Sequence, residues 1–159
     1  MVNASALIKA IQRNQWVIQA QTEGLDHAAS VQQLPFRGNC MNWVVGHIAA
    51  HRDRMSAALN LEPALDSIQT ARYARGSAPV TDAADSVRLE QMLETLAQQT
   101  DRLTSALAAV TPEVLDAVYD AERGDTVGDR VEFLIWHETY HVGQLEMLRQ
   151  LAGTDDAII

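Results

Sequence analysis

The sequence predicts an all-α fold, a four-helix bundle with one long crossover connection between the second and third helices. Two observations lead to this prediction. Four long stretches carry apolar residues at helical spacing, and no stretch shows the alternation that is typical of a half-buried strand. A bundle is the simplest way for four such helices to bury their apolar faces together. At 159 residues, the chain is most simply one domain, residues 1–159, with a core of its own.

The first helix is expected to begin at a cap formed by Asn3 or Ser5, and Gly24 is expected to end it. Asp26 is a suitable cap for one further turn before the next proline. His27 lies in this polar turn, and we expect its side chain to be exposed. The face of the first helix that we expect to be buried comprises Leu7, Ile8, Ile11, Trp16 and Val17.

The second helix is predicted over residues 41–59, with His51 near the centre of its apolar stripe and His47 at the margin. Residues 61–81 contain two prolines and a glycine and show no clear periodicity, so this stretch is predicted to be the long crossover. The stripe of the second helix comprises Val44, Ile48, Met55 and Leu59.

The third helix is predicted to begin at Thr81 or Asp82. Residues 111–113 (TPE) combine a cap with a proline at the first helical position, and they predict one short turn. The acidic residues 120–125 are expected to form a loop before the last helix. The apolar residues expected on the buried face of the third helix are Val87, Leu89, Leu93, Leu96, Leu103 and Leu107.

The fourth helix is predicted to open with a capping box formed by Thr126 and Asp129, and to end at Gly153. Residues 133–149 read as one continuous helix, although Gly143 lies inside it. Its apolar residues fall on a common side at about 100° per residue. They are Val127, Val131, Leu134, Leu145 and Leu148.

Composition excludes several classes of function. The formal net charge is −9, and the sequence contains one lysine and eleven arginines without a basic patch, which argues against nucleic acid or an anionic membrane as a partner. The single cysteine, Cys40, excludes an internal disulfide and a cysteine-based zinc cluster. The N-terminal residues lack an apolar signal core, and no run of ~18 apolar residues is present to span a membrane. We therefore expect a cytoplasmic protein.

The predicted fourth helix places two histidines and a glutamate near its core face. His137 and His141 lie four residues apart, a spacing at which two imidazoles can bind one metal ion. Glu138 lies near the middle of the apolar stripe, where an unpaired carboxylate is costly. Residues 137–141 match HExxH, the zinc-protease pattern, but no histidine follows His141 as a third ligand and no strand edge is predicted to hold a peptide. A protease is therefore disfavoured.

His47 and His51 form a second pair with the same spacing on the second helix. Either histidine could be a hydrogen-bonded core residue, but two such pairs on facing helices favour a metal site. On helical geometry His51 lies about 40° closer to the centre of its stripe, which favours it over His47 as an inward ligand.

Four further residues are candidates for a binding site. Trp43, Trp136 and Tyr140 could wall a ligand pocket, although aromatic residues at helical spacing are more often packing residues. Cys40 lies two helical turns before His47 and is a weaker candidate for a ligand or a nucleophile. These alternatives remain open on sequence grounds.

Residues 39–52 (NCMNWVVGHIAAHR), 73–77 (YARGS) and 133–153 (FLIWHETYHVGQLEMLRQLAG) resemble the DinB-like (YfiT-like) metalloenzyme superfamily over nearly the whole chain. The resemblance implies a four-helix bundle, commonly a homodimer, with one divalent metal ion (zinc or nickel) bound by three histidines. By position in the family pattern these are His47, His137 and His141. His51 would then be a neighbour, either hydrogen-bonded in the pocket or an occasional fourth ligand.

Some members of this family are S-transferases or isomerases that use low-molecular-weight bacterial thiols such as bacillithiol or mycothiol. The resemblance therefore implies a metal-dependent enzyme with a thiol cosubstrate and a small electrophilic substrate. A metal-dependent hydrolase and a binding bundle without catalysis are the alternatives. Three neutral imidazoles leave an open coordination position, with Glu138 as the expected general base and Gln144 and Tyr140 as supporting groups. Metal occupancy is expected to fall below about pH 6, near the ordinary histidine pKa.

Overall fold

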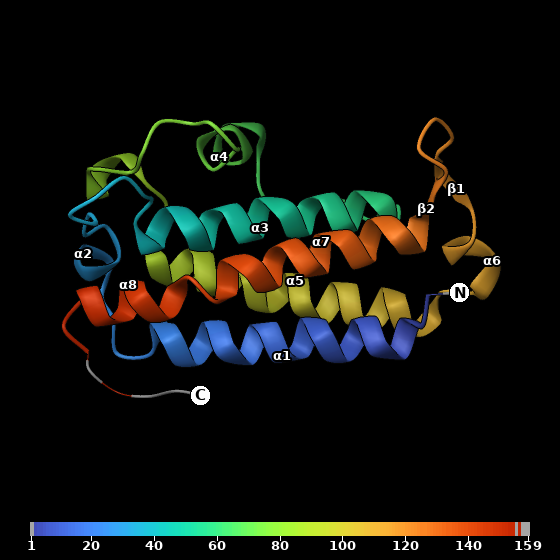
Figure 1. The fold of residues 1–159 in the computed structure, drawn as a ribbon, viewed down its shortest axis with the longest axis horizontal. Helices are drawn as coiled ribbons and strands as arrows, with labels where there is room; N and C mark the ends of the chain where they lie inside the picture. Colours follow the sequence, from blue (N-terminus) through green and yellow to red (C-terminus); the bar gives the residue numbers. More distant parts are fainter. Residues whose placement is uncertain (1, 155, 157–159) are drawn as a thin grey trace.

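Four long helices lie side by side in the computed structural model, which describes residues 2–154 and residue 156 (Figure 1). The predicted all-α class is confirmed, because helices dominate the described chain. None of these helices has an apolar stretch long enough to cross a membrane. The four long helices are α1 (Ala4–Thr22), α3 (Met41–Ala58), α5 (Leu89–Ala109) and α7 (Val127–Val142).

Helix α1 is capped, as predicted, by Asn3, whose side chain accepts hydrogen bonds from the backbone amides of Ser5 and Ala6. The prediction that Trp16 is buried is wrong, since 54% of its surface is exposed. The inward positions are taken by Ile11, Gln15 and Ile18, which follow one another at helical spacing, and Trp16 lies about 100° away from Gln15. The polar side chain of Gln15 therefore faces the core, where the apolar pattern had placed the side chain of Trp16.

His27, in the short helix α2 (His27–Ser30), is buried rather than exposed as predicted. Its Nε2 donates to the carbonyl oxygen of Ala83 (3.0 Å), and its Nδ1 accepts a hydrogen bond from the backbone amide of Leu89 (3.2 Å). Leu89 is the first residue of α5, so His27 caps a helix that lies about 60 residues away in the chain. The local sequence carries no sign of this contact.

The crossover (residues 59–88) joins α3 to α5 and contains two short helices. A capping box formed by Asp66 and Gln69 begins α4 (Ser67–Arg72). This helix was not predicted, because it is too short to show a periodic apolar pattern. Three buried side chains hold the crossover against the long helices: Leu65, Tyr73 and Val80.

The predicted start of the third long helix at Thr81 or Asp82 is wrong. The Asp82 side chain caps only the 3-10 turn η1 (Ala83–Asp85), and α5 begins later, at Leu89. The cap at Asp82 is real, but the chain leaves the helical path after one turn because Ser86 is extended. The crossover is therefore longer than residues 61–81.

A small hairpin precedes α7, contrary to the prediction that the chain has no strand. After α6 (Pro112–Leu115), strand β1 (Val118–Asp120) pairs in the antiparallel direction with β2 (Asp125–Thr126). Strands of three and two residues are too short to show a periodic pattern. The predicted capping box is confirmed, since the side chains of Thr126 and Asp129 each bond the other's backbone amide.

The predicted single helix over residues 133–149 is interrupted. Gly143 and Gln144 keep helical dihedral angles, but the amide of Gln144 donates to the carbonyl oxygen of His141, three residues back, at 3.0 Å. This tighter turn separates α7 from α8 (Leu145–Leu151), which continues in nearly the same direction (Figure 1). Gly153, with φ of +91°, ends the last helix as predicted.

The core has two apolar clusters, one toward each end of the long helices. Between them lies a layer of buried polar side chains to which every long helix contributes one residue. This polar layer comprises Gln15 from α1, Arg52 from α3, Thr100 from α5 and Glu138 from α7.

Candidate metal centre

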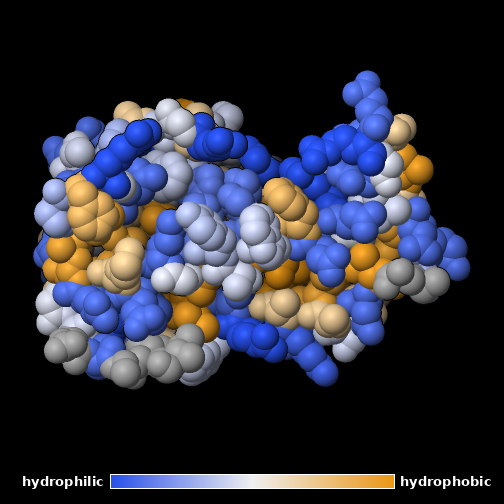
Figure 2. Space-filling view, viewed as in Figure 1, coloured by the Kyte–Doolittle hydropathy of each residue, from blue (hydrophilic) through white to orange (hydrophobic). Residues whose placement is uncertain are grey.

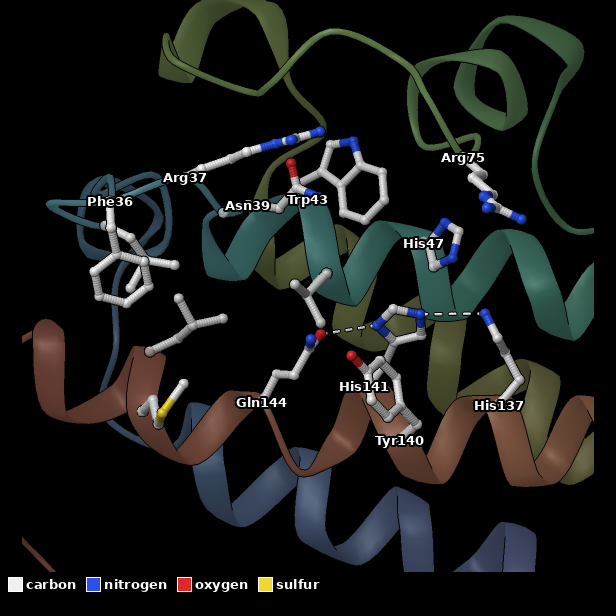
Figure 3. Close-up of a pocket in the computed structure, with 15 residues that line it drawn as sticks. Phe36, Arg37, Asn39, Trp43, His47, Arg75, His137, Tyr140, His141 and Gln144 are labelled. Atoms are coloured by element: carbon white, nitrogen blue, oxygen red, sulfur yellow. Dashed lines mark hydrogen bonds between the residues drawn. The ribbon is translucent and has the colours of Figure 1, made fainter.

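Three imidazoles from two helices converge on one point beside the polar layer. His47 on α3 and the pair His137 and His141 on α7 each offer a ring nitrogen, and these nitrogens lie within 4.8 Å of one another (Figure 3). The Nε2 atoms of His137 and His141 are 3.2 Å apart. Clustered imidazole nitrogens are common ligands of divalent transition metals, so this group could hold a metal ion.

The crossover fixes the orientation of His47. Its Nδ1 donates to the carbonyl oxygen of Tyr73 at 2.7 Å, and because a carbonyl only accepts, this bond places the proton on Nδ1. The lone pair of Nε2 is therefore free to bind a metal. The Trp43 indole stacks on the same ring, with centroids 4.6 Å apart, and its Nε1 donates to Ser77 Oγ at 2.9 Å.

Gly46, immediately before His47, allows Tyr73 to lie against α3. A Cβ at Gly46 would lie 2.3 Å from a ring carbon of Tyr73, which is closer than side-chain contacts permit. The Tyr73 hydroxyl donates to Asn42 Oδ1 (3.0 Å) and accepts from the amide of Val87 (2.9 Å). The tyrosine is thus held at its ring, its hydroxyl and its carbonyl.

Gln144 orients His141, as expected for a supporting group. Its Oε1 accepts a hydrogen bond from His141 Nδ1 at 2.8 Å, which leaves the Nε2 lone pair directed at the cluster. The amide orientation is assigned from this network. Gln144 follows His141 across the tighter turn at Gly143, and both side chains line the same cavity.

His51 lies against the cluster without joining the group of three. Its ring stacks on that of His137, with centroids 4.1 Å apart and planes 24° from parallel. The Nδ1 atoms of His51 and His137 are both buried and have no hydrogen-bond partner among the described residues. The geometry therefore groups His47 with the two α7 histidines, and His51 is their neighbour.

All four histidines are held in their neutral form at pH 7. Burial lowers the pKa of His47 and of His137 to about 4, with nearby positive charge as a further cause. Burial also lowers the pKa of His51 to about 2 and lowers the pKa of His141. Neutral imidazole is the form that binds a metal, so the cluster does not have to release protons before it binds an ion near neutrality.

A cavity of about 540 Å³ opens on one side of the three histidines. Trp43 and Tyr140 line it, as considered from the sequence, whereas Trp136 is 63% exposed and borders a groove beside α1 instead. Figure 2 shows apolar residues at the end of the molecule where α2 and α8 lie. The apolar part of the cavity wall comprises Leu34, Phe36, Val44, Met147 and Leu148.

Glu138 faces the core and not the histidines. Its side chain is fully buried, and its two oxygens accept hydrogen bonds from Nη2 and Nε of Arg52, at 2.8 and 3.1 Å. It lines neither of the cavities that border the histidines. This geometry is that of a structural ion pair, in contrast to the general-base role expected from the HExxH pattern.

Arg52, which sequence reasoning missed, completes this pair. Its Nη1 donates to the carbonyl oxygen of Leu96 and to the side chains of Gln15 and Thr100, all within 2.8 Å. One signal could have revealed it, because Arg52 lies between Ile48 and Met55 on the apolar stripe of α3. A buried carboxylate on one helix requires a buried cation on a facing helix.

Cys40 has no part in the candidate site. Its thiol is buried, lies 3.4 Å from the carbonyl oxygen of Val80, and does not line the cavity. Burial raises the pKa of the Cys40 thiol, which disfavours the thiolate that a nucleophile or a metal ligand requires.

No curated protein matches the sequence. A solved structure from Enterococcus faecalis, described as the conserved protein of a locus, superimposes with a TM-score of 0.75 at 19% identity. The match covers 97% of this chain and 99% of that one, and at this identity it shows a shared fold. The sequence model of the DinB superfamily matches residues 5–145.

Proposed function

The chain belongs to the DinB superfamily, and from this premise we propose that it is a divalent-metal-dependent enzyme that joins a low-molecular-weight thiol to a small electrophilic substrate. One observation carries the proposal. His47, His137 and His141 present their nitrogens to one point at the wall of an open cavity. We assign the four long helices and the crossover to the four-helix bundle that the resemblance implies.

The residues present fit a divalent ion of the zinc or nickel type. Imidazole suits both metals, and the 3.2 Å between the Nε2 atoms of His137 and His141 suits two ligands of one ion. The hydrogen bonds to Tyr73 and Gln144 set the tautomers that ligation requires. We propose one ion per chain, bound by the three histidines.

A bound divalent ion would lower the pKa of a thiol or of water toward neutrality and so supply a nucleophile. The protein's own residues hold the reactants. The stacked Trp43 keeps the His47 ring in place, and the apolar wall of the cavity receives the organic part of a substrate and excludes water from it.

Two features of the cavity favour thiol transfer over hydrolysis. The space is far larger than water requires and is partly apolar, which suits an organic cosubstrate. Water also needs more activation than a thiol, whose ordinary pKa is about 8.5. Glu138, the carboxylate that could act as a base on water, is bound to Arg52 and does not face the cluster. A metal-dependent hydrolase and a metal- or ligand-binding bundle without turnover are the alternatives.

Metal analysis and a thiol-transfer assay test the proposal together. Protein purified without a chelating tag should contain about one divalent ion per chain, and His47→Ala protein should contain far less. With a low-molecular-weight thiol and a chlorodinitrobenzene, the thiol sulfur bonds to the ring carbon, chloride leaves, and the thiol proton passes to solvent. Absence of metal from loaded, desalted protein would overturn the proposal, and ester cleavage without thiol would favour the hydrolase.

We also propose that the chain forms the homodimer that the resemblance implies, and that the two copies pair through α7. Phe133, Trp136 and Tyr140 are 49%, 63% and 61% exposed, an unusual concentration of aromatic surface on one helix. Sedimentation of Trp136→Glu protein should show a monomer. Ile68→Glu, at an exposed apolar residue of α4, is the control and should leave the dimer intact. A monomeric wild-type protein would contradict the pairing.

A further inference from the structure

A second, smaller cavity lies beside the histidine cluster and is lined by three arginines. Its volume is about 190 Å³. Arg54 comes from α3, Arg75 from the crossover and Arg130 from α7, so three separate elements bring their guanidinium groups to one place. Figure 2 shows hydrophilic residues in the notch between the crossover and the hairpin, over α3 and α7. We call this space the arginine cavity.

The arginine cavity is joined to the larger cavity by shared residues. His47, His137 and Arg75 line both spaces. In Figure 3 the Arg75 side chain extends from the crossover toward His47 and His137. One small molecule can therefore reach both cavities and pass the histidine cluster between them.

These three guanidinium groups have no carboxylate partner among residues 2–154 and 156. The ion pairs within that part of the chain use Arg52, Arg88, Arg123 and Arg149. Arg130 has a buried Nε without a hydrogen-bond partner, and its guanidinium is held over the rings of Tyr119 and Phe133, 5.5 and 5.8 Å from their centroids. In a chain with 21 acidic residues and a net charge of −9, three unpaired arginines in one place require an explanation.

The acidic residues nearest in sequence are engaged elsewhere. Asp53, beside Arg54, accepts hydrogen bonds from the amides of Ala64 and Leu65 and from the side chain of Gln99. Asp129, beside Arg130, accepts hydrogen bonds from the amide and the hydroxyl of Thr126. Folding therefore turns both carboxylates away from the arginine cavity and leaves it positively charged.

We propose that the arginine cavity binds a compact oxyanion, a carboxylate or phosphate group, carried by the small molecule whose reacting part lies at the histidine cluster. Guanidinium groups match the geometry of both oxyanions and form strong charge-assisted hydrogen bonds with them. This inference rests on the proposed function for the reacting part alone. The oxyanion site itself is built from arginines and needs no metal.

The site would select substrates by their charge and by their length. An anionic group bound by Arg54, Arg75 and Arg130 fixes one end of the substrate, and the rest of the molecule extends past His47 and His137 into the larger cavity. Neutral analogues would lose this anchor and the orientation that it provides. The substrate class is therefore a small electrophile, or a thiol, with a carboxylate or phosphate group.

Calorimetric titration of metal-free protein tests the proposal without depending on the metal. At neutral pH and constant ionic strength, inorganic phosphate is the probe in one series and acetate in the other, and the stronger binder identifies the preferred oxyanion. Wild-type protein should bind one equivalent saturably. Arg75→Gln and Arg130→Gln should each weaken binding about 10-fold or more, because each removes charge-assisted hydrogen bonds.

Arg88→Gln is the matched control, since Arg88 is an exposed, ion-paired arginine outside both cavities. It should bind as wild type does. Thermal unfolding of each variant confirms folding, and Arg75→Gln, at an exposed position, keeps the test valid if Arg130→Gln is unstable.

No saturable binding of either anion, or an equal loss in Arg88→Gln, would overturn the oxyanion site and leave the metal site untouched. Conversely, metal-free protein that binds the anion but cannot be loaded with metal would overturn the proposed function alone. Metal affinity of Arg75→Gln should equal that of wild type, which separates the two sites in one molecule.

Discussion

The Arg52–Glu138 pair of the polar layer and the histidine cluster are built from neighbouring residues of the same two helices, yet they differ in one physical respect. In the polar layer, Arg52 and Glu138 are fully buried, and each donor and acceptor of the pair meets a protein partner. In the histidine cluster, nitrogens of His51 and His137 lack partners, and cavities open on both sides. A fully partnered ion pair of this kind stabilises the fold, whereas an open cluster has binding capacity left for a ligand.

Helical geometry separates the two clusters. His51 and Arg52 are adjacent on α3, and His137 and Glu138 are adjacent on α7, but successive side chains point about 100° apart. A pattern of five letters such as HExxH therefore describes two different environments in this protein. Substitutions in one environment therefore test whether the other depends on it, through the stability of the fold and the metal affinity.

Glu138→Gln should have the largest effect, and the effect should be on stability. It leaves the Arg52 guanidinium buried without a negative partner, which typically costs about 3–5 kcal/mol, or a fall in Tm of roughly 10 °C at this chain length. Thermal unfolding measures it. Metal affinity at a temperature where the variant is folded should be nearly unchanged.

The double variant Arg52→Met with Glu138→Leu is the control, and it should recover part of the lost stability because it removes both charges. If Glu138→Gln were instead as stable as wild type but about 100-fold less active, Glu138 would be the general base after all.

His47→Ala should have the next largest effect, this time on metal affinity. Loss of a direct ligand should weaken binding by more than the ~10–100-fold that is typical for loss of a residue supporting a ligand. His51→Ala, one helical turn away, should remain within that smaller range. Titration with a competing chelator compares the two. Tight binding by His47→Ala together with loss in His51→Ala would show that His51 is the ligand.

The pH dependence of the histidine cluster should be shifted toward acid. The folded protein holds the pKa of His47 and His137 at about 4, so protons compete with a metal only as the pH approaches that value. The ordinary histidine pKa had predicted loss below about pH 6. Metal content after dialysis at stepped pH values should therefore remain nearly constant down to about pH 5. Release with a midpoint near 6.5 would contradict the lowered pKa values.

The same shifts predict an acid-sensitive metal-free protein. As the pH falls below about 6.5, the unfolded chain binds protons at its histidines, while the folded chain excludes them until about pH 4. The free energy of unfolding should therefore decrease over this interval and show no contribution from these groups above it. Urea titrations measure the slope, which should be smaller in His51→Phe because one such group is removed.

Gln144→Ala should have the smallest effect. It removes the acceptor of the His141 Nδ1 proton and leaves every ligand in place. Metal affinity should fall by about 10-fold, at the lower end of the range for such supporting residues. Gln150→Ala, at an exposed position of α8, is the control and should bind metal as wild type does. An unchanged affinity in Gln144→Ala would mean that water replaces the amide.

The periodic parts of the fold were predictable, and so was the set of histidines. Apolar spacing located the long helices, and local capping chemistry located Asn3 and Thr126. The family pattern predicted that His47 joins the histidine pair on α7, whereas helical geometry alone had favoured His51. The caps and the grouping of these three histidines are confirmed, because each depends on residues close together in sequence or on a resemblance. Their role as metal ligands stays a prediction.

The errors share one cause, which is contact between distant segments. His27 is buried because Ala83 and Leu89 supply its hydrogen bonds, and nothing near residue 27 indicates this. In the same way, nothing near residue 138 indicates that Glu138 pairs with Arg52, which lies 86 positions earlier in the chain. A periodic pattern predicts which face of a helix is buried, but it does not predict which side chain of the facing helix contacts it.

The crossover has a consequence for the dynamics of the site. Tyr73 contributes the carbonyl that orients His47, and the same segment carries Arg75 and Ser77. Few side chains of this segment are buried against the long helices, so it can open as a local unit while the long helices remain folded. Each opening would release His47 and dismantle both cavities at once. Ligands that bind there would therefore slow amide hydrogen exchange in residues 65–80, which gives a readout of binding that requires no knowledge of the reaction.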